Sequence, residues 1–477
     1  MLAWVLFCAC PGPVTPFGAD GGSHDGGLIS AIDGSVNDAG QVTVDGGSVD
    51  AGVVDAGPFD AGPEPITAIR PVPGALTVIQ LDMPFVSGFQ TPTGESAIIV
   101  GPDGTLALID VGNSMHNDTV RNAIRNLNTT DLTTARGYAV NREALQVEWV
   151  LITHLHSDHM GGLAGLLSGA DALKVTKGIV YRGMVDLGGS LSLSGNPPHD
   201  HFDSFCPVMR GAFQALERPL CHTTQGTPSC LSNDWGGNRY QASECDGLSH
   251  GDLSTSADDA AGAASFISLG GDARITLLGV NGYVRDGNSL VVAPAWAYND
   301  NDQENARSLV GLLSQGAFRY VFAGDLPGSG SKDAPDLESF VIVHAAAANW
   351  ATLGVDVSHA NHHARKTSSG PAYTASLAPK DGKARNVIAG INAAYIGAPF
   401  TGVASPSKDA LESWCSDNHL GGGQFWVTNV AAFSSTVPEL VVAKSNVVLQ
   451  TIQAGMGYRI QTTGTPMVSK AFASVRK

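Results

Sequence analysis

Residues 153–162 read THLHSDHMGG, and they directly follow the apolar run VEWVLI. Such a run predicts a buried strand, and the glycine pair predicts a turn into the next helix. Alternate side chains of an extended segment lie on one face, so His154 and His156 project together. Asp158 and His159 follow where the chain turns, and a turn brings them round to the same place. The fold must therefore end a buried strand beside a cavity lined by histidine.

Imidazole nitrogens and carboxylate oxygens are the ligands that zinc prefers, and manganese and iron accept them as well. A lone histidine is more often an ordinary core or surface residue. That alternative explains poorly why three histidines and one aspartate occupy six positions between a buried strand and a glycine pair. The segment therefore predicts a metal site.

The chain from Ile66 onward alternates apolar runs with glycine and proline. Residues 119–127 and 161–170 predict helices. The predicted strands, of which the second is a pair joined by a Pro-Asp-Gly turn, are residues 76–82, 96–112, 147–153, 273–280, 308–314, 318–325, 355–360, 386–393 and 424–430. Strands outnumber helices while helices recur between them, which favours an α/β fold of two sheets faced by helices.

The first ten residues, MLAWVLFCAC, are a short apolar run that ends in small residues. The run is too short for a transmembrane helix, which takes about 20 residues. It fits the tail of a signal peptide whose start lies upstream, because the first basic residue is Arg70. Cys10 resembles the lipidation site of bacterial lipoproteins. We expect an exported protein, secreted or anchored in the cell envelope by a lipid on Cys10, with an apolar N-terminus of no function as the alternative.

Residues 11–65 consist mostly of Gly, Asp, Ala, Val and Pro, and an aspartate recurs every five residues from Asp45 to Asp60. Too few large apolar side chains are present to offset the entropy of ordering, so we expect a disordered, flexible linker. A calcium-binding array is the alternative, but the EF-hand and nonapeptide spacings are both absent. Residues 66–477 are expected to form the folded domain.

A stretch at about residues 185–265, rich in Gly, Ser, Asn and Cys, predicts an insertion in that domain. Four of the seven cysteines lie in it, namely Cys206, Cys221, Cys230 and Cys245. Such clustering favours disulfides formed in an oxidising compartment. A structural zinc site is the alternative, although no C-x-x-C pair occurs. Cys415 is expected to be a buried free thiol.

The formal net charge is −17, and nine of the acidic residues precede Ile66, which leaves −8 for the rest of the chain. A mildly acidic domain gives no electrostatic argument for non-specific nucleic-acid binding over its whole surface. The chain has no G-x-S-x-G elbow, P-loop or dinucleotide-binding glycine fingerprint. Serine-hydrolase, nucleotide-binding and NAD-dependent functions therefore have no support.

The H-x-H-x-D-H pattern resembles the signature of the metallo-β-lactamase superfamily. LALIDVGN places Asp110 where that family has a carboxylate that braces the metal loop, and FAGD places Asp325 where a carboxylate bridges two metals. The resemblance implies a four-layer αββα sandwich of two mixed sheets faced by helices, and two divalent metal ions, with zinc the first expectation and manganese the alternative.

Further segments resemble the soluble domain of ComEC-type competence proteins, over roughly residues 75–429. The corresponding segments are VIQLD (78–82), GESAIIV (94–100), NARSLVGLL (305–313), VFAGDL (321–326), SHANHHARKTSS (358–369) and QFWVTN (424–429). Those proteins carry the domain on a membrane channel. No membrane-spanning run follows the N-terminus here, so the resemblance implies the hydrolase module and not DNA import.

The resemblance also implies a ligand set. His154 and His156 would bind one metal, Asp158 and His159 the second, Asp325 would bridge them, and His362 would complete the second site. His359 and His363 are alternatives to His362, because three histidines within five positions leave the register open. The candidate catalytic residues are Asp158, which would orient the nucleophile, together with His363 and Lys366.

Two features depart from the family. The third histidine that the superfamily supplies to the first metal is missing, because His199, His201, His222 and His250 all lie in the predicted insertion. The first site is then expected to be weaker, or to be completed by water or Asn281. Second, Arg365 and Lys366 follow the His-His pair where family members have Gly-Ser. These cations form either a solvated turn or a contact to a substrate phosphate, extended into a basic strip by Lys380, Lys383 and Arg385.

The first functional hypothesis is an exported metal-dependent hydrolase that uses a metal-bound hydroxide on a phosphodiester, and a nuclease is one form of it. The second is hydrolysis of a lactone, thioester or β-lactam on the same dinuclear site. The third is a metal-stabilised surface domain without catalysis. The expected partner is a small-molecule or phosphodiester substrate, with nucleic acid as one candidate, and the sequence predicts no oligomeric state.

Overall fold

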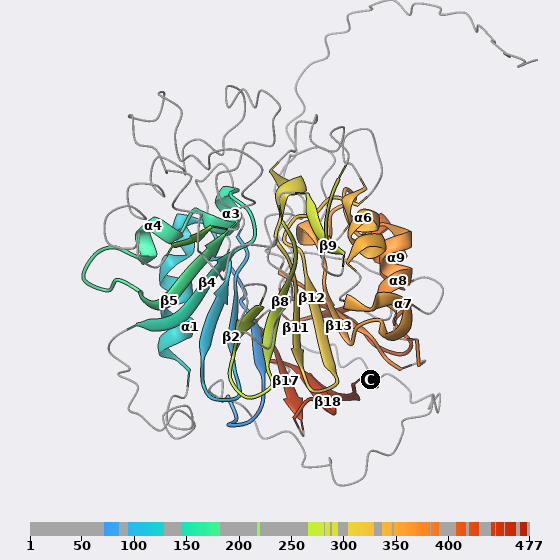
Figure 1. Cartoon of the computed structure of the whole chain (residues 1–477). Coiled ribbons are helices and arrows are strands. Elements are labelled where there is room, and N and C mark those ends of the chain that lie inside the picture. Colours follow the sequence, from blue (N-terminus) through green and yellow to red (C-terminus); the bar gives the residue numbers. More distant parts are fainter. Residues whose placement is uncertain are drawn as a thin grey trace, which may run out of the picture. The chain divides into compact units, whose positions relative to one another are not determined.

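Two β-sheets pack face to face, and helices cover the outer face of each sheet (Figure 1). This arrangement is seen in a computed structural model. The residues that it describes are 71–84, 94–127, 145–181, 217–219, 266–280, 282–286, 289–293, 304–328, 336–345, 348–378, 380–381, 383–390, 407–415, 419–428, 440–443, 445–452, 454–463 and 468–474. The α/β sandwich of two mixed sheets that the sequence predicts is confirmed.

The first sheet is antiparallel on one side and parallel on the other. The hairpin predicted around the Pro-Asp-Gly turn is present, and the sheet becomes parallel where the third strand pairs with the fourth. Its strands, in spatial order, are β19 (Ser469–Ala473), β18 (Gly457–Thr462), β17 (Val447–Ile452), β1 (Thr77–Gln80), β2 (Ala97–Val100), β3 (Leu106–Ile109), β4 (Gln146–Ile152), β5 (Lys174–Tyr181) and β6 (Glu217–Pro219).

The second sheet has the same mixed character, with antiparallel pairing as far as its fifth strand and parallel pairing from there on. Its strands, in spatial order, are β10 (Ser289–Val292), β9 (Tyr283–Asp286), β8 (Arg274–Val280), β11 (Val310–Gln315), β12 (Phe318–Phe322), β13 (Val357–His359), β14 (Asn386–Ala389), β15 (Phe425–Val427) and β16 (Leu440–Val442), and β7 (Phe266–Ser268) pairs with β8.

The helices form the two outer layers. The first sheet is covered by α1 (Asn117–Arg125), α3 (Ser157–Met160) and α4 (Leu163–Leu166), and the second by α6 (Leu337–His344), α7 (Trp350–Leu353), α8 (Pro371–Leu377) and α9 (Lys408–Cys415). Short 3₁₀ turns are η1 (Ser114–His116), η7 (Asn305–Arg307) and η9 (His362–Ala364). Because α1 buries Val120, Ala123 and Ile124 on one face, it packs on the sheet as an amphipathic helix.

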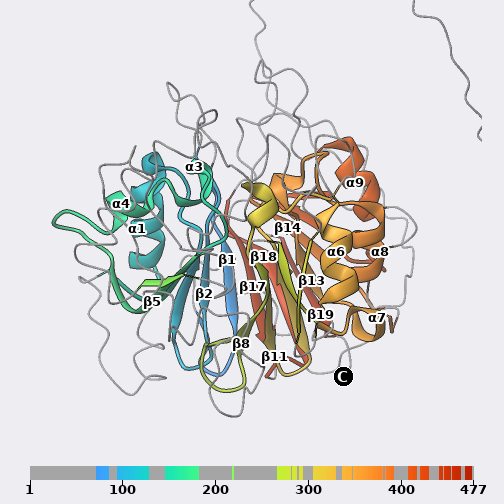
Figure 2. The ribbon, with the colours of Figure 1, turned by 45° about the horizontal axis from the view of Figure 1, so that its top comes forward.

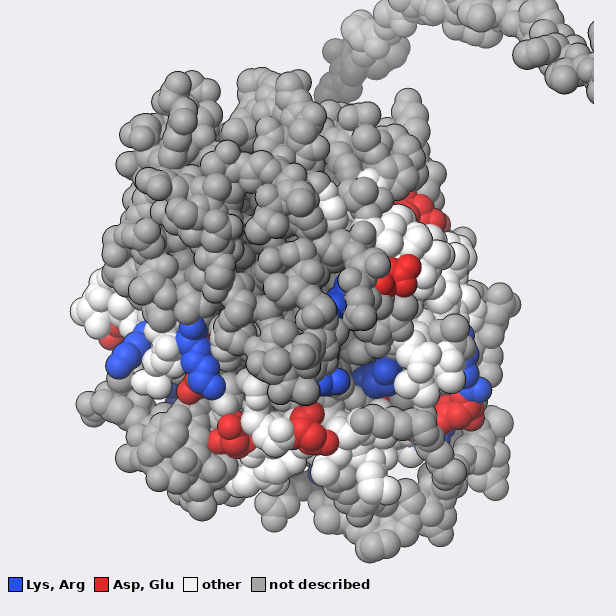
Figure 3. Space-filling model, in the orientation of Figure 1, with Lys and Arg blue, Asp and Glu red and all other residues white. Residues whose placement is uncertain are grey.

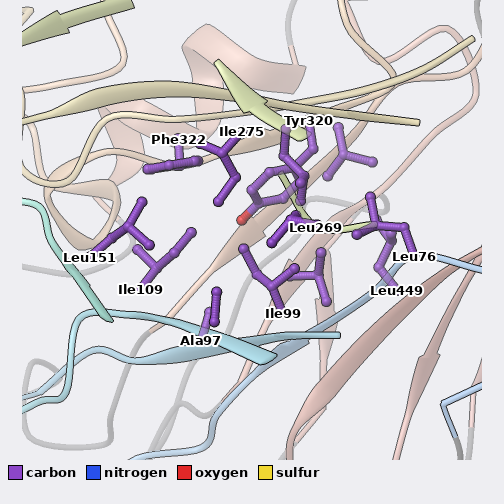
Figure 4. Packing of buried hydrophobic residues seen from close by; sticks show 14 of the residues in the cluster. Leu76, Ala97, Ile99, Ile109, Leu151, Leu269, Ile275, Tyr320, Phe322 and Leu449 are labelled. Atoms are coloured by element: carbon purple, nitrogen blue, oxygen red, sulfur yellow. The ribbon is translucent and has the colours of Figure 1, made fainter. Parts of the chain in front are cut away.

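The two sheets share a central apolar core. Leu151, Ile109 and Ile99 of the first sheet face Ile275 and Phe322 of the second (Figure 4). Burying each side chain of this size stabilises the fold by about 1.5–3 kcal/mol. Strand β4 is apolar on both faces because one face packs in this core and the other under the helices. The strand that leads into THLHSDHMGG is therefore held on both sides.

Several expectations lie outside the described residues: the signal and lipidation segment 1–10, the linker 11–65, and most of the insertion at about 185–265 with its four cysteines. Cys415 is a free cysteine on α9 and is half-buried, not fully buried. Within the described part of the chain, none of the helices is long and apolar enough to cross a membrane.

Candidate metal centre

The predicted ligands gather where strands of both sheets end, at the edge that Figure 2 brings forward. Parallel strands end at the same edge of a sheet, and that geometry collects side chains distant in sequence. His154 and His156 follow β4, Asp158 and His159 lie in α3, Asp325 follows β12, and His362 and His363 follow β13 in η9. The structure thus brings together all the residues predicted from the two separate motifs.

Asp325 lies at the centre of this cluster and is 2% exposed. Its Oδ1 is 3.1 Å from Nε2 of His159, and its Oδ2 is 3.7 Å from Nε2 of His154. Burial alone would raise the pKa of Asp325, but the neighbouring histidines, His159 first, hold it well below its usual range. The carboxylate is therefore ionised and central, as a bridging ligand must be.

Two compact groups of candidate ligand atoms share Asp325. One contains His154, His156 and Asp325, and the other contains Glu95, His159, Asp325 and His363. Within each group the candidate ligand atoms all lie within 4.8 Å of one another. The two groups share one carboxylate, but the second contains Glu95 and His363 where the resemblance implies Asp158 and His362.

The donor set fits divalent cations. His154 Nε2 faces His156 Nδ1 at 3.1 Å, and His159 Nε2 faces His363 Nε2 at 3.3 Å. In each pair only one of the two facing nitrogens can donate a hydrogen bond to the other. At least one nitrogen of each pair therefore points a lone pair into the buried site. Asp325 Oδ1 is buried, and within the described residues its neighbour is the His159 ring at 3.1 Å, without a hydrogen bond of good geometry. A cation would satisfy both the lone pairs and this oxygen.

The protonation of the buried histidines follows their surroundings. Burial first, and then the positive charge of His159, hold the pKa of His154 well below its usual value. Burial would also lower the pKa of His159, but the carboxylates of Asp325 and Asp110 raise it well above its usual value. His154 is therefore neutral at neutral pH, as a metal-binding imidazole must be, whereas His159 would have to release a proton to bind a cation.

The H-x-H segment is fixed from the second sheet. Glu304, just before η7, accepts a hydrogen bond from the backbone N–H of Leu155 at 2.8 Å. Leu155 stands between the two histidines, and its side chain is buried in the core under the helices. The carboxylate of Glu304 therefore holds the backbone that sets the direction of both imidazoles.

Asp158 is the least buried of the acidic candidates, with a side chain 17% exposed. Its Oδ2 lies 3.3 Å from Nε2 of His363. Burial would raise the pKa of Asp158, but the hydrogen bond from His363 and the charge of His159 hold it well below its usual value. Asp158 is thus an ionised carboxylate at the least buried part of the cluster, and its predicted role of orienting a nucleophile stays a prediction.

Asp110 lies behind the cluster, in the supporting place that the sequence predicts. Its Oδ1 accepts a hydrogen bond from the backbone N–H of Thr153 at 2.7 Å, and its Oδ2 lies 2.8 Å from Nδ1 of His159. The Thr153 hydroxyl also donates to Oδ2, at 2.7 Å. The contact at Nδ1 leaves Nε2 of His159 as the atom that faces Asp325.

Replacing Asp110 by asparagine is expected to weaken metal binding at the second group by about 10- to 100-fold, because His159 loses the carboxylate that orients it. Competition with a chromogenic chelator measures this affinity. Asp118→Asn is the matched control, since that side chain is 90% exposed on α1. Unchanged affinity in Asp110→Asn would show that Asp110 does not orient His159.

Glu95 is the residue that sequence reasoning missed. Its Oε1 contacts Nε2 of His359, and its Oε2 lies 3.5 Å from Nδ1 of His363. Burial would raise its pKa, but His359 and then His363 lower it. His359 thus contacts Glu95. The Nδ1 atom of His363 lies near the carboxylate of Glu95, as the Nδ1 atom of His159 lies near that of Asp110. The signals in the sequence were an acidic residue two positions before the apolar strand of residues 97–100 and its place in the segment GESAIIV (94–100).

The His-His pair differs from the order expected. His363, kept as an alternative, lies in the second group beside Asp158 and His159. His362 belongs to neither of the two groups, although its Nε2 lies 3.7 Å from Asp325 Oδ2 and its Nδ1 2.7 Å from the Thr367 hydroxyl. Asn281, the expected substitute for the missing histidine, lies outside the described residues, as do the four histidines of the insertion.

The basic residues after the pair separate in the structure. Arg365 is half-buried, with Nη1 3.3 Å from Nε2 of His362, whereas Lys366 is exposed. Arg385 does not extend a surface strip: it is fully buried, donates to the carbonyl of Thr374 and lies 4.8 Å above the ring of Trp414. On the face shown in Figure 3, described acidic and basic side chains are interspersed.

Comparison with known proteins gives one family match. Residues 91–231 match the profile described as the metallo-beta-lactamase superfamily, and no curated protein matches the chain. The chain is similar to the metallo-beta-lactamase fold protein YhfI from Bacillus subtilis, at 10% identity and a TM-score of 0.32, covering 79% of this chain and 99% of that chain. It is also similar to a new diphosphatase from the PhnP family, at 11% identity and a TM-score of 0.32, covering 79% of this chain and 97% of that chain. A third similar structure is Tm1679, a metal-dependent hydrolase of the beta-lactamase superfamily, at 11% identity and a TM-score of 0.29, covering 75% of this chain and 97% of that chain.

Proposed function

We propose that this chain, whose residues 91–231 match the metallo-β-lactamase superfamily, is a hydrolase that uses two divalent cations to cleave phosphodiesters. Zinc is the first choice for the cations and manganese the second. When bound, such cations lower the pKa of water and neutralise charge that develops on phosphoryl oxygens. His154, His156, Asp158, His159, Asp325 and His363 would hold them.

The residues of the chain divide the remaining work. Asp158, ionised and at the open side, would accept a hydrogen bond from the attacking water and so orient it. Asp110 and Glu95 hold the rings of His159 and His363 from behind. Each of these roles depends on a carboxylate whose position is fixed by the two sheets.

The observation that favours a phosphodiester is Arg365. Its guanidinium reaches the edge of the cluster, 3.3 Å from His362, and a planar cation with several donors suits an anionic phosphate better than a neutral carbonyl. The similarity of the surrounding segments to ComEC-type proteins supports the same substrate class. Lys366, exposed on the same turn, would add positive charge beside it.

We expect the protein to hydrolyse bis(4-nitrophenyl) phosphate, and Arg365→Ala to lower kcat/KM about 10- to 100-fold, the value of one charged hydrogen bond. Lys174→Ala is the matched control, because Lys174 is exposed at the opposite end of the parallel strands. Parallel assays use a chromogenic β-lactam and a lactone.

Faster turnover of the β-lactam or the lactone would overturn the proposed substrate in favour of a carbonyl compound. Full metal content without turnover of any substrate would favour a non-catalytic domain. An equal loss in Lys174→Ala and Arg365→Ala would show that general charge, and not the position of Arg365, attracts the phosphodiester.

A further inference from the structure

Among the described residues, the first group of candidate ligands has three members, one fewer than the four of a closed tetrahedral site. It contains two histidines and Asp325, whereas the second group has Glu95, His159, Asp325 and His363, with Asp158 beside His363. The histidine that the superfamily places between its main motif and the bridging aspartate has no counterpart in β8, which reads RITLLGV. Within the part of the chain that the structure describes, a nitrogen ligand for the first group must therefore come from another element.

The turn that carries the His-His pair has an unusual backbone. His362, His363 and Ala364 have φ values of 50°, 51° and 57°. This left-handed conformation is unfavourable for every residue with a Cβ, and here three occur in a row. Strain of this kind persists where surrounding contacts impose it, and it concentrates at functional sites.

The surrounding contacts impose it from several sides. The backbone N–H of His362 donates to the carbonyl of Gly324, one residue before Asp325, at 3.0 Å. The Ser368 hydroxyl donates to the carbonyl of Asn361 at 2.6 Å. The turn separates the two imidazoles, whose ring centroids are 6.3 Å apart. The two rings thus approach Asp325 Oδ2 from separate positions, with Nε2 of His362 at 3.7 Å and Nε2 of His363 at 3.8 Å.

His362 has the orientation of a ligand. Its Nε2 lies 3.7 Å from Asp325 Oδ2, the same distance at which Nε2 of His154 approaches that oxygen. Its Nδ1 lies 2.7 Å from the Thr367 hydroxyl, which can accept an Nδ1 proton and leave the Nε2 lone pair free. Asn305 Nδ2, 3.4 Å away, and Arg365 now face that lone pair.

We infer that His362 is the third protein ligand of the first metal, and that the left-handed turn splits the His-His pair so that each histidine serves a different ion. The inference rests on the proposed use of two metals. Arg365, whose Nη1 lies 3.3 Å from Nε2 of His362, would then be available to the substrate phosphate.

Metal counting in paired variants tests this assignment. After equilibration with Zn²⁺ and removal of free ion, wild-type protein is expected to hold two equivalents, and His154→Ala, His362→Ala and His363→Ala one each. The double variants distinguish which ion His362 binds. H154A/H362A loses two ligands of the same ion and is expected to hold one equivalent of zinc. H154A/H363A loses one ligand of each ion and is expected to hold none. Circular dichroism checks folding, and His362→Gln repeats the test with a milder change.

Two equivalents in both His362→Ala and His362→Gln would overturn the inference, because His362 would then bind neither ion. No metal in H154A/H362A would also overturn it, by assigning His362 to the second ion. Wild-type protein that holds two equivalents but cleaves no phosphodiester would overturn the proposed substrate and, with one equivalent in H154A/H362A, would leave the ligand assignment established.

Discussion

Asp325→Ala is expected to remove both metal equivalents and to lower phosphodiester kcat/KM by at least about 10³-fold, or roughly 4 kcal/mol of transition-state stabilisation. Asp325 is common to both groups of ligand atoms, so its loss opens both sites at once. It would also leave buried histidines around an empty space, with the pKa of His159 no longer raised by this carboxylate. Metal analysis and steady-state kinetics on the same preparation measure the two effects.

The control for Asp325→Ala is Asp171→Ala, which removes a carboxylate exposed at the surface beside Arg125. Asp325→Asn keeps the size of the side chain and is expected to retain no more than one equivalent, since the amide offers a single oxygen. Full metal content and full activity in Asp325→Ala would show that the bridging assignment is wrong.

The second large effect is expected at Glu338, a fully buried carboxylate of α6. Its Oε1 accepts hydrogen bonds from Asn361 Nδ2 and from the N–H of Ser369, both at 2.8 Å, and its Oε2 accepts from the N–H of Gly370 at 2.7 Å. Asn361 directly precedes the turn of the His-His pair, and Ser369 and Gly370 follow it, so Glu338 holds both ends of this segment. Glu338→Ala leaves three donors without their acceptor, at about 1–3 kcal/mol each, so we expect at least about 3 kcal/mol of lost stability.

Urea denaturation at pH 7 measures this loss, and the same variant is expected to bind metal more weakly because the turn is released. Glu412→Ala, an exposed glutamate on α9, is the matched control. Stability within about 0.5 kcal/mol of the wild type would contradict the role given to Glu338.

Glu338 also predicts a pH dependence. Burial raises its pKa to about 7, from an ordinary value of 4.5. The folded protein therefore binds a proton that the unfolded chain has released between these pH values, so stability falls as the pH rises from about 4.5 to 7, by roughly 3 kcal/mol. Denaturation at several pH values checks the slope, which Glu338→Gln should abolish. A slope that persists in Glu338→Gln would assign it to other groups.

The strands and the first half of the site could be predicted because their signals are local. Apolar runs in the sequence predicted β1, β4 and β12. The three histidines of residues 154–159 lie within six consecutive positions, so their pattern could be recognised without the structure. Asp110 and Asp325 could be placed because each follows an apolar strand that the family resemblance identified.

The rest depends on geometry that no short segment encodes. A left-handed turn at residues 362–364 decides which histidine faces which group of ligands. The turn contains no glycine, so the sequence His-His-Ala does not predict its conformation. Glu95 acts on His363 across the two sheets, so its role appears only when both are assembled. Arg385 looked like a surface cation, but packing on Trp414 accounts for its burial. The last strands, β17 to β19, belong to the first sheet, far from their neighbours in sequence.

That return of the chain has a consequence for synthesis. Thr77 of β1 pairs with Gln450 of β17, so the N-terminal sheet keeps an open edge until about 370 further residues have left the ribosome. At 5–20 residues per second this takes roughly 20–75 s. An apolar strand with unpaired backbone groups is a template for aggregation throughout that time. Newly made chains should therefore depend on chaperones until β17 arrives, and yield should fall steeply if translation pauses after β16.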